Sequence, residues 1–230
     1  VVAAMTLPGL VNKYQERAWL TQFKVTYSIL SQAYLRAYQE NGVIKNWGLP
    51  TDNKAEAARI VAEKLLPYLN LAQDWKQNSQ NSSHNLPTHY RDLNGIMQGT
   101  GFNGWDSQHY MFALANGAVC GLSDVGIDEV DNKLRVGIYV DTNGAAGPNQ
   151  MGKDFFFLYL NTKKGYPIIT GYDLWWVTKN YCSRSYTGGG WYSGGACAIW
   201  VIATGNMEYL HREITTEEWN EILKAGDIKE

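Results

Sequence analysis

Apolar residues recur every three or four positions in the first forty residues of this chain. This stripe consists of Trp19, Phe23, Tyr27, Leu30, Tyr34 and Tyr38. Charged side chains such as Lys13, Glu16 and Lys24 lie off it, as in a helix that packs one face on a core. Glu40-Asn41-Gly42 supplies the end, because glycine tolerates the left-handed conformation that terminates many helices. The pattern predicts one long amphipathic helix that ends near residue 41.

The first twelve residues, VVAAMTLPGLVN, carry no charge. The run is shorter than the roughly 20 apolar residues that span a bilayer, and it lacks the basic residues that open a signal peptide. We expect residues 1–12 to be the end of a longer hydrophobic helix that continues into the amphipathic part, with Pro8 as a kink or as its start. The alternative is a buried N-terminal segment of the domain itself.

The remaining pattern predicts a helix, then strands, then a final helix. A helix is expected from about Asp52 to Leu66, capped by Thr51 or Asp52. Asn116-Gly117 joins apolar runs at 110–114 and 118–122, which is a strong hairpin signal. Further strands are expected at 134–140, 155–160 and 198–203. Thr215 and Glu218 have capping-box spacing before the last helix.

This order of elements predicts an α+β fold. Helices that come before a run of strands favour an antiparallel sheet covered on one side. We expect residues 1–41 to form the long helix, packed on the sheet of a globular head at residues 42–230. A chain of 230 residues with 45% hydrophobic content is long enough to bury such a core.

Two of the three cysteines, Cys182 and Cys197, bracket a segment rich in glycine, serine and tyrosine. A disulfide closing this C-terminal loop would stabilise the fold by roughly 3 kcal/mol and would indicate an oxidising compartment. Three free thiols in a reducing compartment are the alternative. Cys120 lies in an apolar stretch, where we expect it to be buried and unreactive.

Charge and motifs narrow the classes of function. The net charge of −2 and the pI of about 6.1 provide no basic surface for nucleic acid, so no nucleic-acid partner is expected. The sequence contains no HExxH, GxSxG or SxxK motif. A nucleophilic pair of Cys120 and His109 would require an accessible thiol, which an apolar strand disfavours. We therefore expect a protein that is not an enzyme.

The best candidates for binding an ion are Asp141, Asn143 and Asp154. Oxygen-bearing side chains at alternate positions, followed by Gly144, are typical of calcium loops, and calcium is the one candidate ion. The alternative is structural, because Asn143-Gly144 makes a turn and Asp141 caps its backbone amides. The sequence lacks the further acidic ligands of a complete calcium loop.

An aromatic cluster surrounds the cysteine-bounded loop. Trp191, Tyr192 and Tyr186 are flanked by glycine and serine, and exposed aromatic rings there would suit a sugar or a partner surface. For Trp175 and Trp176 we expect core packing.

Three segments at the start, middle and end of the chain give it a family resemblance, and the short hydrophobic N-terminal one carries the least weight. VVAAMTLPGLVNKYQ, running into a long amphipathic helix, resembles the stretch after the cleavage and methylation site of type IV prepilins. DTNGAAGPNQMGKDFFFLYL, residues 141–160, resembles the D-x-N-G-x-x-G-P-N-x-x-G-x-D-x-F pattern of pilin-like and pseudopilin-like proteins, and is the most specific of the three. CAIWVIATGNMEYL, residues 197–210, is similar to the end of such proteins.

The resemblance implies a structural subunit of a bacterial type IV pilus or type II secretion filament, either a pilin or a pseudopilin. It implies self-assembly and assembly with other pilin subunits. It also implies an anchor in the inner membrane before assembly, and an exported head in a periplasmic or extracellular filament. The expected assembly interface consists of Val2, Leu7, Leu10, Trp19 and Phe23. The alternative function is an exported carbohydrate- or surface-binding module that uses the aromatic loop near the C-terminus.

Overall fold

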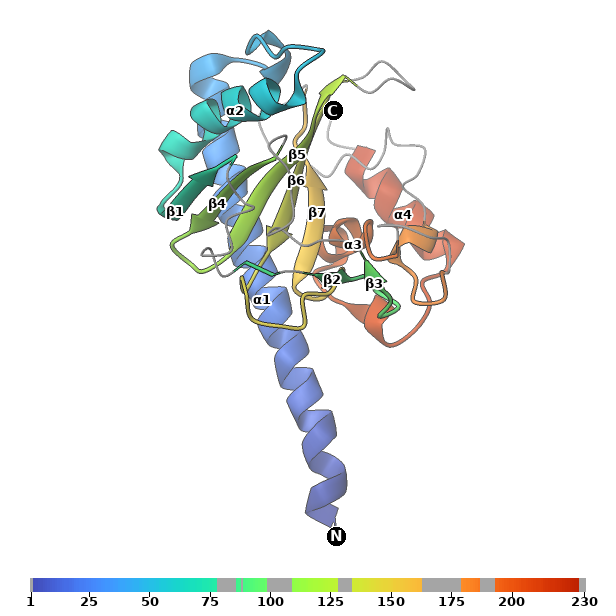
Figure 1. Cartoon of the computed structure of the whole chain (residues 1–230). Helices are drawn as coiled ribbons and strands as arrows, with labels where there is room; N and C mark the ends of the chain where they lie inside the picture. The colour runs from blue at the N-terminus through green and yellow to red at the C-terminus, as the bar shows by residue number, and fades with distance from the viewer. Residues whose placement is uncertain are drawn as a thin grey trace.

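A computed structural model of the chain describes residues 2–77, 86–87, 89–98, 109–127, 134–162, 179–186 and 193–227, with the backbone alone at 2–9, 98, 124 and 225–227. It is an α+β fold. A long N-terminal helix crosses an antiparallel sheet, and a group of short C-terminal helices lies beside the edge strand at residues 155–159 (Figure 1). The predicted fold class is confirmed.

Helix α1 (Val2–Asn41) is the longest element. It ends as predicted, since Gly42 follows at φ 73° and its N–H donates to the carbonyl of Tyr38 at 2.8 Å. Pro8 lies within α1 and does not mark its start. The N-terminal part of the helix extends beyond the head, whereas the rest lies along the sheet (Figure 1).

Helix α2 (Lys54–Leu65) follows a 3-10 turn, η1 (Ile44–Asn46), and continues into η2 (Leu66–Tyr68). Its N-cap is Asn53, whose side chain accepts a hydrogen bond from the Glu56 N–H at 3.0 Å. The prediction of Thr51 or Asp52 as the cap was therefore wrong by one or two residues. Asparagine caps as well as aspartate does, and three candidate caps in a row cannot be ranked by composition.

The main sheet has five strands in the order β1-β4-β5-β6-β7, all antiparallel. They are β1 (Leu71–Lys76), β4 (Tyr110–Leu114), β5 (Val119–Ile127), β6 (Leu134–Asp141) and β7 (Phe155–Tyr159). The predicted hairpin at Asn116-Gly117 joins β4 to β5, with Ala113 opposite Val119. Strand β1 was not predicted, and neither was a separate pair, β2 (Tyr90–Arg91) and β3 (Met97–Gln98).

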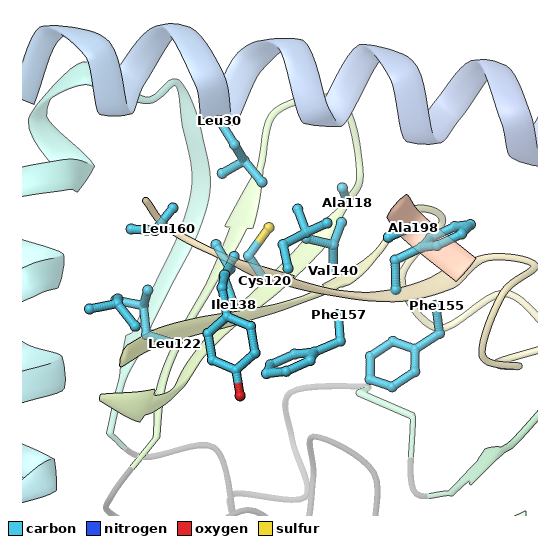
Figure 2. Packing of buried hydrophobic residues seen from close by; sticks show 14 of the residues in the cluster. Leu30, Ala118, Cys120, Leu122, Ile138, Val140, Phe155, Phe157, Leu160 and Ala198 are labelled. Carbon is cyan, nitrogen blue, oxygen red and sulfur yellow. The ribbon is translucent and has the colours of Figure 1, made fainter. Parts of the chain in front are cut away.

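Alternate residues of β7 pack on opposite faces of the sheet, which is why the strand is apolar throughout. Phe156 contacts α1, where its ring lies 4.2 Å from that of Phe23. Phe155 and Phe157 point away from α1 (Figure 2). On that second face the ring of Phe155 stacks on Tyr90 at 3.7 Å.

The core between α1 and the sheet contains Leu30, Val140 and Cys120, which Figure 2 places between the helix and the strands. A buried hydrogen bond from the Tyr34 hydroxyl to the carbonyl of Asn161 spans the same layer at 2.6 Å. Cys120 is fully buried, as expected, and burial raises the pKa of its thiol. A thiol that stays protonated in the core is not a nucleophile.

The C-terminal part consists of η5 (Lys179–Cys182), α3 (Cys197–Thr204), η6 (Glu208–Leu210) and α4 (Thr216–Asp227). The prediction of a strand at 198–203 was wrong, since these residues belong to α3. Its first five residues are all buried, and a fully buried apolar run shows no period that separates strand from helix. The capping box of α4 is confirmed: Thr215 Oγ1 accepts from the Glu218 N–H and Glu218 accepts from the Thr215 N–H.

The disulfide between Cys182 and Cys197 is confirmed, with the two Cα atoms 4.7 Å apart. It joins η5 to the start of α3. The structure thus keeps the predicted closure of the C-terminal loop, although a helix rather than a strand follows it.

Candidate functional site: an oxygen-lined loop and an exposed helix segment

Residues 141–154, here called the oxygen loop, connect β6 to β7. Asp141 starts it, and its Oδ1 accepts a hydrogen bond from the Asn143 N–H at 3.2 Å. Asp154 closes it by accepting the N–H groups of Gln150 at 2.8 Å and Asn149 at 2.9 Å. Gly144 and Asn149 have positive φ values of 65° and 51°, which glycine and asparagine tolerate best. The sequence thus folds the two carboxylates into one loop.

Both carboxylates are fully buried. Burial is the main cause that raises the pKa of Asp141, and the nearby charge of Asp154 adds to it. Burial likewise raises the pKa of Asp154, against the opposing effect of the N–H groups of Gln150 and Asn149. Two acidic groups in a shared buried loop disfavour each other's ionised form.

Oxygen atoms converge at the side chain of Asn149. One polar atom of its amide lies 3.2 Å from Asp141 Oδ2, 3.3 Å from the carbonyl of Gly144 and 3.1 Å from that of Ala146. All three neighbours are acceptors, so the amide orientation that satisfies them places the NH₂ group of Asn149 there as their donor. Asn143 Oδ1 is buried as well, and has no hydrogen-bond partner among the described residues.

The predicted residues Asp141, Asn143 and Asp154 do come together in this loop. Across the described residues, no group of three or more histidine, cysteine, aspartate or glutamate side chains is placed to hold a metal. A cation in the oxygen loop would therefore depend on carbonyl and amide oxygens as well as on carboxylates, which is usual for calcium. The sequence reasoning missed Asn149 and the two carbonyls. The Gly-Pro-Asn triplet was the available signal, because asparagine tolerates positive φ.

The oxygen loop also joins three parts of the head. Gln150 donates from Nε2 to the carbonyls of Asp92 at 3.0 Å and Leu93 at 3.1 Å, next to β2. The hydroxyl of the buried Tyr209, in η6, donates to the carbonyl of Gly152 at 2.7 Å. The conformation of this loop therefore fixes how β2 and the C-terminal helices sit on the sheet.

The second candidate functional site, after the oxygen loop, is an exposed apolar surface near the start of α1. Leu10, Val11 and Tyr14 are 67%, 49% and 75% exposed. Positions 10 and 14, and 11 and 14, are neighbours on a helix surface, so the three side chains form one apolar surface, here called the exposed helix segment. Val2 and Leu7 lie in the same helix, with side chains outside the described residues.

Among the described side chains of α1, contact with the head begins at Glu16. Glu16 Oε2 lies 2.7 Å from His211 Nε2, and Lys24 donates to the carbonyl of Gly205 at 2.9 Å. Trp19 packs partly buried on the core, with the Lys153 ammonium 5.7 Å from its ring centre. Phe23 is 1% exposed, so its assignment to an assembly interface was wrong; it belongs to the core of its own chain. The helical stripe alone could not separate a contact with the head from a contact with a partner.

Of the three aromatic residues predicted to form a ligand surface, Tyr186 alone lies within the described residues. Tyr186 is half-buried, its ring lies edge-on to Tyr181 at 5.3 Å, and its carbonyl accepts a hydrogen bond from the Asn94 side chain at 2.9 Å. Trp191 and Tyr192 lie outside the described residues, as do Trp175 and Trp176.

Comparisons of the chain with protein-family models, with curated proteins and with solved structures find no match. The pilin resemblance therefore rests on the motif residues themselves. Within the part of the chain that the structure describes, no helix combines the length and the apolar character needed to cross a membrane.

Proposed function

We propose that this protein is a structural subunit of a bacterial type IV pilus or type II secretion filament, and not an enzyme. The observation that carries the proposal is the exposed helix segment at the start of α1, which stands clear of the head (Figure 1). Among the described residues, no element covers Leu10, Val11 and Tyr14. A surface of this kind is suited to pack against the same helix of other copies and of other pilin subunits.

The energetics favour covering this surface. Full burial of one large apolar side chain is worth about 1.5–3 kcal/mol. Leu10 and Tyr14 are at least two-thirds exposed in the single chain, so most of that free energy is still to be gained. Repeated along a helical array of subunits, the gain would make the helix the assembly element and leave the head on the outside.

The head supports an exported location. The structure joins Cys182 to Cys197 in a disulfide, and disulfides are common in oxidising compartments and rare in the cytosol. In the proposal the N-terminal helix anchors the subunit in the inner membrane before assembly, and the head folds on the oxidising side. The finished filament is periplasmic or extracellular.

The alternative, an exported carbohydrate- or surface-binding module, depends on Trp191 and Tyr192. Neither residue is described, and Tyr186 is half-buried against Tyr181. The alternative stays a prediction from the sequence.

Electron microscopy of sheared cell-surface and periplasmic fractions tests the proposal in the cells that make the protein. We expect filaments that bind an antibody against the head. The variant Tyr14→Asp places a charge in the exposed helix segment and should abolish them. The control Gln39→Asp makes the same change at an exposed site near the other end of α1 and should leave them intact. Antibody labelling of single, dispersed molecules alone would refute the proposal.

A further inference from the structure

We propose that one face of the head binds the surface of a bilayer that contains anionic lipids. This face, here called the basic patch, consists of Arg91, Ile96, Met97, Lys153 and Arg184. The contact rests on the proposed function, because α1 has to enter the inner membrane to bring the head to its surface. It is separate from that anchor, since the head itself makes it with the leaflet from which α1 emerges.

The apolar part of the basic patch is the tip of the β2–β3 hairpin. Ile96 and Met97 are 53% and 54% exposed, and among the described large apolar side chains only Leu10 and Tyr14 are more exposed. The Ile96 N–H donates to Oδ1 of the buried Asp92 at 3.0 Å, which fixes the turn. Exposed apolar side chains that lie together commonly mark a surface that contacts a protein or a membrane.

Basic side chains accompany this tip. Arg91 and Arg184 are exposed, and their guanidinium groups donate to the backbone carbonyls of Gly95 at 3.0 Å and Leu210 at 2.9 Å. Lys153 is half-buried. Among the described residues, no carboxylate forms an ion pair with any of these basic side chains. Their positive charges are therefore available to an anionic partner.

The hairpin tip lies beside the segment that carries Arg184. Asn94, in the hairpin turn, donates from its side chain to the carbonyl of Tyr186 at 2.9 Å, and Tyr186 closely follows Arg184 in the chain. Strand β2 also pairs with the oxygen loop through a bridge between Arg91 and Gln150. The apolar tip and the basic side chains therefore belong to one surface.

Lys153, in the oxygen loop, lies close to Arg184 as well. The Tyr209 hydroxyl donates to the carbonyl of Gly152 at 2.7 Å, and Arg184 donates to the carbonyl of Leu210, the next residue, at 2.9 Å. Burial lowers the pKa of Lys153, and the positive charge of Arg184 lowers it further. An anion such as a lipid phosphate would stabilise like charges that the fold holds together in this way.

The carboxylates near the basic patch have donors within the chain. Glu213 accepts a hydrogen bond from Ser183 Oγ at 2.6 Å, and Glu16 Oε2 lies 2.7 Å from His211 Nε2. Asp154 is buried and accepts backbone N–H groups of the oxygen loop. The basic side chains of the patch, in contrast, have no described ion-pair partner.

The basic patch lies toward the projecting part of α1. Strands β2 and β3 lie in the half of the head from which α1 projects (Figure 1). The Lys153 ammonium lies 5.7 Å from the ring centre of Trp19, and Lys13 and Arg17, on either side of Tyr14, are exposed. At a bilayer surface, apolar side chains enter the headgroup layer and basic ones bind anionic lipids. Charge and position therefore both favour an anionic bilayer surface as the partner.

The test is binding of the whole chain to vesicles, measured by sedimentation. One kind of vesicle is phosphatidylcholine alone, and the other is a mixture with phosphatidylglycerol. Arg184→Gln should weaken binding to the mixed vesicles about fivefold, whereas the control Arg36→Gln, at an exposed site of α1, should not. Replacing Ile96 and Met97 with serine should weaken it about tenfold. The control Ile127→Ser, at a 38% exposed site where β5 ends in the opposite half of the head, should leave it unchanged (Figure 1).

A fluorophore whose emission depends on polarity measures the contact directly. It is attached to Met97→Cys, and to Ile127→Cys as the control. Cys120 stays unlabelled, because its thiol is fully buried. On mixed vesicles the emission from position 97 should shift to shorter wavelength, and that from position 127 should not.

The outcomes separate this contact from the proposed function. Equal binding to both kinds of vesicle, no binding to either, or an unshifted emission from position 97 would each overturn the head contact. If the chain binds only through the exposed helix segment, Tyr14→Asp abolishes binding and the head variants bind as the parent does; the head contact is then refuted and the filament proposal stands. Loss of the expected filaments from electron microscopy, with the emission shift present, refutes the proposed function alone.

Discussion

Replacing Phe23 with alanine measures how strongly α1 is bound to the sheet. The Phe23 side chain is 1% exposed, and its ring lies 4.2 Å from Phe156 and 6.1 Å from Tyr27. Removal of a fully buried phenylalanine ring costs about 3–5 kcal/mol, since both the transfer free energy and the contacts around the cavity are lost. For a chain of this size that corresponds to a fall in melting temperature of roughly 6–20 °C.

Urea unfolding followed by circular dichroism gives the free energy of unfolding for the parent and the variant. The matched control is Val25→Ala, on the same helix but with 46% of its side chain exposed, which should change that free energy by no more than about 0.5 kcal/mol. A loss below about 1 kcal/mol for Phe23→Ala would mean that α1 is not docked on β7, and the division of α1 into a buried part and an exposed segment would then be wrong.

Two further predictions concern the C-terminal part. Cys182 and Cys197 close a loop with a sequence separation of 15. Replacing both with serine should lower the free energy of unfolding by about 3 kcal/mol. An unchanged midpoint of urea unfolding would contradict this prediction. Glu218 accepts hydrogen bonds from the Arg212 guanidinium and from the Thr215 N–H, which lower its pKa to about 2. The ionised carboxylate therefore stabilises the folded chain at any pH above the usual glutamate pKa. This contribution to the free energy of unfolding is lost as the pH falls toward 2. Arg212→Ala should return that pKa toward its usual value in an NMR titration, and an unmoved pKa would show that the guanidinium is not its main cause.

The buried face and the end of α1, and the turn between β4 and β5, could be predicted because each has a signal in the local sequence. The three- and four-residue spacing around Phe23 and Leu30 identified the buried face of α1, and Gly42 identified its end. Asn116-Gly117 identified the turn between β4 and β5. At these positions the core requires apolar side chains and the turns require glycine or asparagine, and the sequence has those residue types there.

Elements without such a signal were missed. Helix α3 is buried from Cys197 to Val201, and these residues are apolar on every side of the helix. The spacing of apolar residues in this segment therefore could not distinguish a helix from a strand. The strands β2 and β3 have only two residues each, too few to show alternation.

The candidate site was half predictable. Asp141, Asn143 and Asp154 stood out by residue type, whereas the carbonyls of Gly144 and Ala146 contribute through backbone geometry, which composition does not report. Asn149 became a candidate only when its side chain was found beside these acceptors. Exposure was likewise invisible in the sequence, which is why Phe23 was assigned to an interface that its burial excludes.

Photo-cross-linking at position 14 tests the central claim, that the exposed helix segment is an assembly surface. A photoreactive phenylalanine analogue would replace Tyr14 in the cells that make the protein, and Gln39 in a parallel strain. The proposed function predicts a ladder of cross-linked subunits from position 14 and a much weaker one from position 39, near the head end of α1. A cross-link yield at position 14 no greater than at position 39, with the chain recovered as a monomer, would contradict it.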